Sequence, residues 1–259
     1  MEGTEVRKLA ELEDDHWWYR ERRHLLAKAV TGLTPGTALD VGAAGGGNTR
    51  VLRGLGWKAG AVEYGADGAE VCHERGVPVL RGDATRLPLA PASLDLVVAF
   101  DVLEHLEDDK AAAAGVFEAL RPGGTFLVAV PADPRLWSAH DDAVGHVRRY
   151  TRETLTDLLA SAGFVLDDVR SWNVLLRPAV ALRRRSSSGS DLSEMPGWLN
   201  AALFGVVVAE RYLPVGRLPG VSLLVRARRP DVPAPQASSS LASSSNAFSP
   251  PPAPTSFES

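Results

Sequence analysis

One stretch of the chain, residues 38–50, constrains the fold more than any other. It reads ALDVGAAGGGNTR, in which a short apolar run ends at Asp40 and a glycine-rich loop follows. Asn48 and Thr49 come next, and both residue types commonly cap helix N-termini, so the pattern predicts a strand, a glycine loop and a helix. Glycine permits positive φ angles and lets a ligand approach the backbone closely. The loop therefore predicts a binding site for a nucleotide or nucleoside.

A glycine loop alone is also compatible with a turn that only packs a helix on a strand. The run KAGAVEYG favours the binding interpretation, because it predicts a second strand that ends with Glu63, about 20 residues beyond the loop. A carboxylate at that position can accept hydrogen bonds from the hydroxyls of a ribose. The alternative for Glu63 is a surface glutamate without a ligand.

Beyond the glycine loop, apolar strand-like runs alternate with helical patterns. Strands are expected at residues 38–41, 58–63, 77–80, 94–100, 124–130 and 164–171, and helices near 48–55, 66–75, 108–120 and 151–162. Such alternation predicts a parallel, doubly wound α/β sheet with right-handed crossovers. Ligands bind at the carboxyl ends of the strands in these sheets, and the glycine loop, Glu63, Asp83 and Asp101 are all expected there.

Four segments, in order, give the chain a resemblance to a known family: LDVGAAGGG at 39–47, VEYG at 62–65, GDATRLPLAPASLDLVVAFDVLEHL at 82–106 and LRPGGTFLVAVP at 120–131. The chain resembles class I S-adenosylmethionine-dependent methyltransferases, in particular the small-molecule group related to UbiE-like and type 11 enzymes. The resemblance implies a Rossmann-like, doubly wound seven-stranded sheet, with the last strand, residues 221–228, inserted antiparallel beside strand five. It also implies S-adenosylmethionine as cofactor and a small-molecule or lipid-like methyl acceptor.

The resemblance further implies a set of cofactor-binding residues: Tyr19, Arg23, Asp40, Gly42, Gly45, Glu63, Asp83, Ala84, Phe100 and Asp101. Tyr19 and Arg23 belong to the cluster HWWYRERR, which would fold over the pocket and meet the methionine carboxylate. The alternative for this cluster is core packing beside a solvated face. Asp83 and Ala84 would recognise adenine, and the alternative for them is an Asx turn.

A long loop, PADPRLWSAHDDAVGHVRRYTRETL, follows the fifth strand, and long connections at the carboxyl ends of strands are usually functional. Its histidines, His140 and His146, lie six residues apart. That spacing fits neither a helical ligand pair nor a zinc pattern, so no metal site is predicted. His146 is instead the predicted general base, with Tyr150 beside it on the acceptor side and His105 as the reserve. The alternatives are a loop held by its own ion pairs and a His105 that only hydrogen-bonds its own loop.

The chain of 259 residues divides into a helical N-terminal lid at 1–34, a methyltransferase domain at 35–229 and a tail at 230–259 that is expected to be disordered. The domain contains an apolar helical insertion at 172–214. The insertion is expected to cap the acceptor pocket, to form a homodimer face, or to lie on a membrane surface beside an amphipathic acceptor, with Arg183, Arg184, Arg185 and Arg211 meeting anionic lipid.

Composition excludes several classes of protein. A net charge of −4 gives no general attraction to nucleic acid, and the single cysteine, Cys72, excludes an intrachain disulfide. The N-terminus carries no secretory pattern, and no run of 18 apolar residues predicts a membrane span. The sequence therefore predicts a cytoplasmic protein, at most peripheral to the membrane.

Ala44 stands where the family's middle glycine is expected. Its methyl group would be tolerated with a negative φ and would otherwise weaken cofactor binding. Two rival functions remain open. Gly42, Ala44 and Gly47 fit a degenerate pattern of an NAD(P)-dependent oxidoreductase. A non-catalytic methyltransferase-like binding protein is the second rival, and Ala44 is the feature that favours it.

Overall fold

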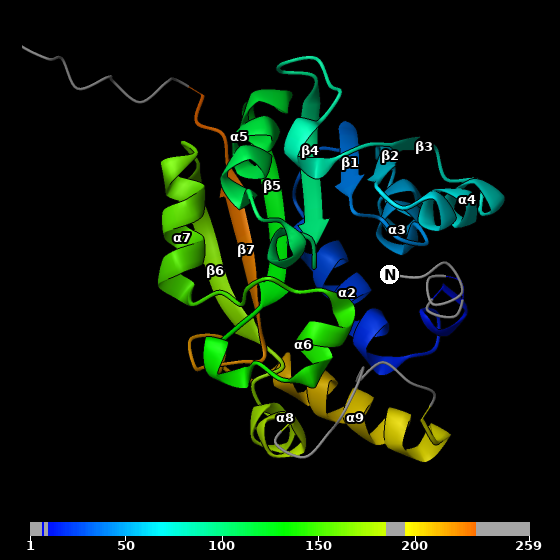
Figure 1. Ribbon diagram of the computed structural model, residues 1–259, viewed down its shortest axis with the longest axis vertical. Helices are drawn as coiled ribbons and strands as arrows, with labels where there is room; N and C mark the ends of the chain where they lie inside the picture. Colours follow the sequence, from blue (N-terminus) through cyan, green and yellow to red (C-terminus); the bar gives the residue numbers. More distant parts are fainter. Residues whose placement is uncertain (1–6, 8–9, 185–194, 232–259) are drawn as a thin grey trace, which may run out of the picture.

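The computed structural model describes residue 7 and residues 10–184 and 195–231. These residues form a seven-stranded sheet in the order β3-β2-β1-β4-β5-β7-β6, seen in Figure 1. The strands are β1 Thr37–Val41, β2 Lys58–Glu63, β3 Val79–Arg81, β4 Leu94–Phe100, β5 Leu120–Pro131, β6 Val165–Trp172 and β7 Ser222–Arg228. Neighbours from β3 to β5 pair in parallel, whereas β7 runs antiparallel to both β5 and β6. The predicted fold is confirmed, including the reversed last strand.

Two strand starts differ from the prediction by two residues or more. The third strand was expected at 77–80, but Val77 packs beneath the sheet with Cys72 and β3 starts at Val79. The fifth strand was expected to start at 124, but β5 already begins at Leu120, which pairs with Leu94 across an irregularity in the ladder. Both errors are of the size expected where strand ends are judged from composition.

Helices cover both faces of the sheet (Figure 1). The α-helices of the described ranges include α2 Trp17–Ala29, α3 Gly47–Gly54, α4 Ala66–Glu74, α5 Asp109–Ala119, α6 Ala139–Val144, α7 Arg152–Ser161, α8 Arg177–Arg184 and α9 Gly197–Glu210. Apolar residues of α5 and α7 pack on one face, and those of α2 and α3 pack on the other. Strands covered on both sides are apolar throughout, as in the LDLVVAF run of β4.

The N-terminal segment, which was expected to form a helical lid, is interrupted at residues 13–16. His16 has an extended backbone, and its Nδ1 accepts a hydrogen bond from the Trp18 amide, so a new helix, α2, begins at Trp17. The break redirects the chain, so that α2 runs along α9 of the insertion. Trp17, Leu176 and Val207 form a small core between them.

The insertion lies at the carboxyl end of the parallel strands, where α8 and α9 are seen at the lower end of Figure 1. The part of it between residues 185 and 194, like most of the predicted tail, is outside the described residues. Within the described ranges, no helix has the length and apolar character needed to cross a membrane.

Candidate active site

A pocket of about 420 Å³ opens at the carboxyl ends of the parallel strands. The parts of the chain that enclose it include the glycine loop after β1, the N-terminal segment with α2, the end of β4 and the turn after it, the loop around α6, and helices α8 and α9 of the insertion. This edge is where open α/β sheets bind their ligands. Of the predicted site residues, Tyr19, Arg23, Gly42, Gly45, Phe100, Asp101, His105 and His146 line the pocket.

The glycine loop is built from residues with left-handed backbone. Gly42 has φ +66°, and a Cβ there would come within 2.5 Å of Val102 Cγ2, so only glycine fits. Ala44 has φ +47°, which an L-residue adopts at a cost of roughly 1–2 kcal/mol. Ala44 therefore lacks the negative φ with which its methyl group would be tolerated without strain, and the alternative of weaker cofactor binding stays a prediction. The alanine is accommodated in a strained backbone, and its amide donates to Glu63 Oε2 at 2.8 Å.

Asp40 supports this loop from beneath. It is 0 % exposed, does not line the pocket, and accepts hydrogen bonds from the Thr49 amide (3.1 Å) and hydroxyl (2.8 Å). Thr49 is therefore not the helix cap that the sequence suggested, since Gly46 occupies that position with φ +77°. Burial raises the pKa of Asp40 to about 6, partly offset by the Thr49 hydrogen bonds.

Glu63, Asp83 and Ala84 lie at the ends of β2 and β3, outside the pocket wall. Glu63 accepts from the amides of Ala44 and Gly65, at 2.8 and 2.9 Å. Asp83 Oδ1 accepts from the amide and hydroxyl of Thr85, both at 2.8 Å, and these bonds lower its pKa. The Asx turn that was the alternative interpretation of Asp83 is present. The role of Asp83 in adenine binding and that of Glu63 in ribose binding stay predictions.

Arg22, a basic residue of α2 that was not predicted as a site residue, lies against two of the predicted cofactor-binding residues. Its guanidinium pairs with Asp101 at 2.8 Å and lies 5.4 Å from the ring centre of Phe100. Arg23 also lines the pocket, but it donates to the backbone carbonyls of Glu13 and Asp14. The cluster HWWYRERR correctly indicated the part of α2 that lines the pocket, but the sequence does not reveal which of its arginines faces the strand ends.

The loop after β5 brings His146 into the pocket, as predicted. Its Nδ1 lies 2.7 Å from Asp141 Oδ1, and the same oxygen accepts from Arg149 Nε at 2.8 Å. His105 lies across from it, with ring centres 4.8 Å apart, and its pKa is lowered by burial and by the charge of His146. Tyr150 does not line the pocket. It is buried and donates to Asp109 Oδ2 at 2.7 Å, anchoring the end of the loop.

Glu104 is a second pocket residue that the sequence analysis missed. It is 0 % exposed, and within the described ranges neither carboxylate oxygen has a hydrogen-bond partner. Burial, reinforced by the nearby charge of Asp101, raises the pKa of Glu104 well above its usual range. The signal available in the sequence was its position, because Glu104 directly precedes His105, which was a predicted site residue.

Comparison with known proteins identifies the family. A model described as a methyltransferase domain matches residues 15–169, more than half of the chain. The chain is 30 % identical over 171 residues to a protein of Mycolicibacterium smegmatis named as a probable S-adenosylmethionine-dependent methyltransferase, covering 64 % of this chain and 66 % of that one. It is also 32 % identical over 118 residues to a demethylmenaquinone methyltransferase of a Mycobacterium species, covering 45 % and 49 %.

Among solved structures, a methyltransferase bound to a methyltransferase activator of Haloferax volcanii superposes with a TM-score of 0.60. It is 18 % identical, over 88 % of this chain and 95 % of that chain. This likeness concerns the fold. The chain therefore belongs to the methyltransferase-domain family of class I, S-adenosylmethionine-dependent enzymes, and it spans about two thirds or less of the curated relatives it matches.

Proposed function

We propose that the protein transfers the sulfonium methyl group of S-adenosylmethionine to a small-molecule acceptor with an apolar body. The observation that carries the proposal is the continuity of one pocket, which joins the glycine loop and Phe100–Asp101 to apolar residues of α8 and α9. A nucleoside cofactor fits the first part of this pocket. An apolar acceptor fits the second, where Val180, Leu199 and Leu203 form the wall.

The cofactor side follows the strand ends. We propose that Glu63 accepts from the ribose hydroxyls and that Asp83, with the Ala84 amide, holds adenine. Glu63 already accepts hydrogen bonds from two backbone amides next to the glycine loop, which orient its carboxylate. Tyr19 and the arginines of α2 lie at the opposite end, where a guanidinium suits the methionine carboxylate. The methyl carbon is already electrophilic, so the protein mainly aligns the acceptor and excludes water.

On the acceptor side, we propose that His146 and His105 activate the acceptor. Asp141 orients the His146 ring through Nδ1, which leaves Nε2 as the basic atom. A base is needed only for an acceptor atom that must lose a proton during attack. In the simplest form of the reaction, His146 accepts that proton, and His105 is the reserve base.

The proposed acceptor is amphipathic, and the protein would then meet a membrane surface through the insertion. The support is the exposure of large apolar side chains there: Leu182 on α8, Trp198 on α9 and Tyr212 just after it, at 70 %, 73 % and 83 %. The predicted arginine contacts contribute less, because Arg184 donates to the Leu136 carbonyl and Arg211 pairs with Glu21. A second copy of the chain could cover the same side chains.

Vesicle flotation tests this finer proposal. The double variant Leu182→Ser, Trp198→Ser should lose binding to phosphatidylglycerol vesicles, whereas Leu80→Ser, an exposed leucine on β3, should keep it. A wild-type protein that does not float, and whose dimer is lost in the double variant, would place the homodimer face there instead.

Calorimetric titration tests the main proposal and its two rivals. Binding of S-adenosylhomocysteine, without binding of NADH or NADPH, is the expected result. Binding of a nicotinamide cofactor would favour the oxidoreductase. Binding of S-adenosylhomocysteine without methyl transfer to any menaquinone-like or phenolic acceptor would favour the non-catalytic binding protein.

A further inference from the structure

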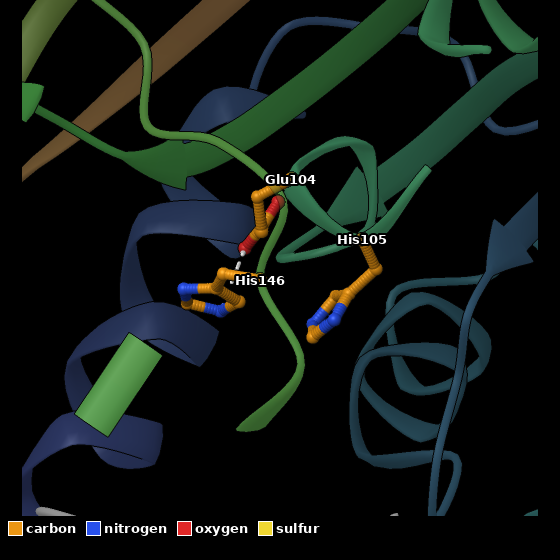
Figure 2. Close-up of side chains that lie close together, drawn as sticks. All are labelled: Glu104, His105 and His146. Carbon is orange, nitrogen blue, oxygen red and sulfur yellow. Dashed lines mark ion pairs between the residues drawn. The ribbon is translucent and has the colours of Figure 1, made fainter. Parts of the chain in front are cut away.

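We infer that Glu104, His105 and His146 form a binding site for a divalent transition-metal ion of the Zn²⁺ type. The inference deepens the proposed function, since the site lies in the pocket on the acceptor side. Figure 2 shows the Glu104 carboxylate and the two imidazole rings lying together, with His146 on a different segment from the other two. One ligand atom from each residue lies within 4.8 Å of the others.

The backbone holds the two segments together independently of any ion. Glu104 and His105 belong to the 3₁₀ turn Leu103–His105, which follows β4 directly. The Glu104 carbonyl accepts from the Val147 amide at 2.8 Å, so His146 is placed against this turn. The Gly145 carbonyl, one residue earlier, contacts the His105 ring at 3.1 Å. The juxtaposition is therefore part of the fold.

In both imidazoles Nδ1 is hydrogen-bonded, so Nε2 is the nitrogen left to bind an ion. A carbonyl oxygen only accepts hydrogen bonds, so Nδ1 of His105 must donate to Gly145, and Nε2 keeps its lone pair. Asp141 Oδ1 likewise accepts from Nδ1 of His146 at 2.7 Å, and the same oxygen accepts from Arg149 Nε at 2.8 Å. A carboxylate on the far nitrogen of a histidine is the usual support of a metal-binding imidazole, because it fixes the tautomer and raises the basicity of Nε2.

Glu104 supplies the second, independent observation. A fully buried carboxylate normally has hydrogen-bond partners, because leaving it without them is costly. Neither oxygen of Glu104 has one among the described residues, and Oε1 lies 3.9 Å from His146 Nε2. His146 Nε2 faces the unpartnered carboxylate, and the ring of His105 lies 4.8 Å from that of His146. A shared cation would satisfy all three groups at once.

The geometry suits an ion with nitrogen and oxygen ligands. Zinc lies about 2.0–2.2 Å from such atoms, so its ligands stand roughly 3–3.5 Å apart. Side-chain rotations that close the present separations by about 1 Å would complete the set. Two histidines and one carboxylate leave further coordination positions open toward the pocket, as in catalytic sites that bind water or substrate. With the ion bound, both Nε2 atoms would act as ligands and not as bases, and the ion would orient the acceptor oxygen in place of the proposed histidine base.

Titration of Zn²⁺ into the full chain, without a histidine tag and after removal of metal by a chelator, tests the site. One equivalent should bind, with micromolar or tighter affinity. Glu104→Gln and His105→Ala should each weaken binding at least about tenfold. His73→Ala, which removes an exposed histidine of α4, is the matched control and should bind as the wild type does. Circular dichroism shows whether each variant is folded.

Substitution with Co²⁺ gives a readout that does not depend on the buried Glu104 variant. The wild-type complex should show visible absorption of a site with nitrogen and oxygen ligands, and His105→Ala should abolish or shift it. Absence of stoichiometric Zn²⁺ binding to the wild type, or equal loss of binding in His73→Ala, would overturn the inference. Titration of S-adenosylhomocysteine into the same preparations separates this failure from failure of the proposed function.

Discussion

Asp40 makes the stability of the protein depend on pH in a direction opposite to that of most native aspartates. The carboxyl is fully buried beneath the glycine loop, and burial raises its pKa from 3.8 to about 6. Only Oδ2 is hydrogen-bonded, to Thr49, and Oδ1 has no partner among the described residues. The folded state therefore holds the Asp40 proton more tightly than the unfolded state does.

The sign and size follow from linkage. Below the ordinary pKa of 3.8, Asp40 is protonated in both states and costs nothing. As the pH rises toward about 6, the unfolded chain ionises first and gains free energy, so stability falls; above pH 6 the loss is complete. A rise of about two pKa units corresponds to about 3 kcal/mol, of which roughly 2–2.5 kcal/mol falls between pH 4 and pH 7.5.

Urea unfolding of the wild type and Asp40→Asn at pH 4, 5, 6 and 7.5 measures this term. Replacing the carboxyl with an amide also changes the free energy of unfolding by an amount that does not depend on pH. The test is therefore how the difference in free energy of unfolding between the two proteins changes with pH. The free energy of unfolding of the wild type should fall relative to that of Asp40→Asn by roughly 2–2.5 kcal/mol over the series. Asp157→Asn, at an exposed position on α7, serves as the control. A difference that stays constant, or that grows in favour of the wild type, would refute the reasoning.

Three further substitutions test the pocket. Glu63→Ala should weaken S-adenosylhomocysteine binding by about 1–3 kcal/mol in calorimetry, the usual cost of losing a charged hydrogen-bond partner; unchanged affinity in the folded variant would exclude its role at the ribose. Arg22→Leu should weaken the same binding more than Arg23→Leu does, because Arg22 lies on Asp101; the reverse order would favour Arg23. Ala44→Gly should raise the free energy of unfolding by roughly 0.5–1 kcal/mol in urea, since relief of a positive φ exceeds the added chain entropy; a loss of stability would contradict the strain.

The fold was predictable because its signals are local and repeated. Apolar runs of strand length, such as LDLVVAF, alternate with helical patterns, and a glycine loop marks the first crossover. The reversal of β7 came from resemblance, since no local property of VSLLVRAR sets its direction. The break at His16 escaped prediction because the helical periodicity of the segment continues across it. A single side-chain cap on the Trp18 amide decides where α2 begins.

The site was only partly predictable, because the orientation of each side chain decides which residues belong to it. Glu63 and Asp101 were placed correctly at strand ends, since chain position alone determines that. The choice between Arg22 and Arg23 requires the rotation of α2 about its axis, which is fixed by packing of Trp17 against the insertion, far away in sequence. Ala44 was judged by residue type, whereas its φ is set by the tight turn on both sides of it.

The proposed metal site shows most clearly what could not be predicted from the sequence. Ligand spacing rules describe ligands on one helix or one turn, so the sequence offered His140 with His146 and the pair was dismissed. The rings of that pair lie 6.2 Å apart, whereas His105, 41 positions before His146, lies at 4.8 Å. Proximity alone would still not favour a metal ion. The deciding property is which nitrogen of each ring keeps its lone pair. The Gly145 carbonyl and the Asp141 carboxylate fix this by binding Nδ1, and such acceptors become visible only after the chain has folded.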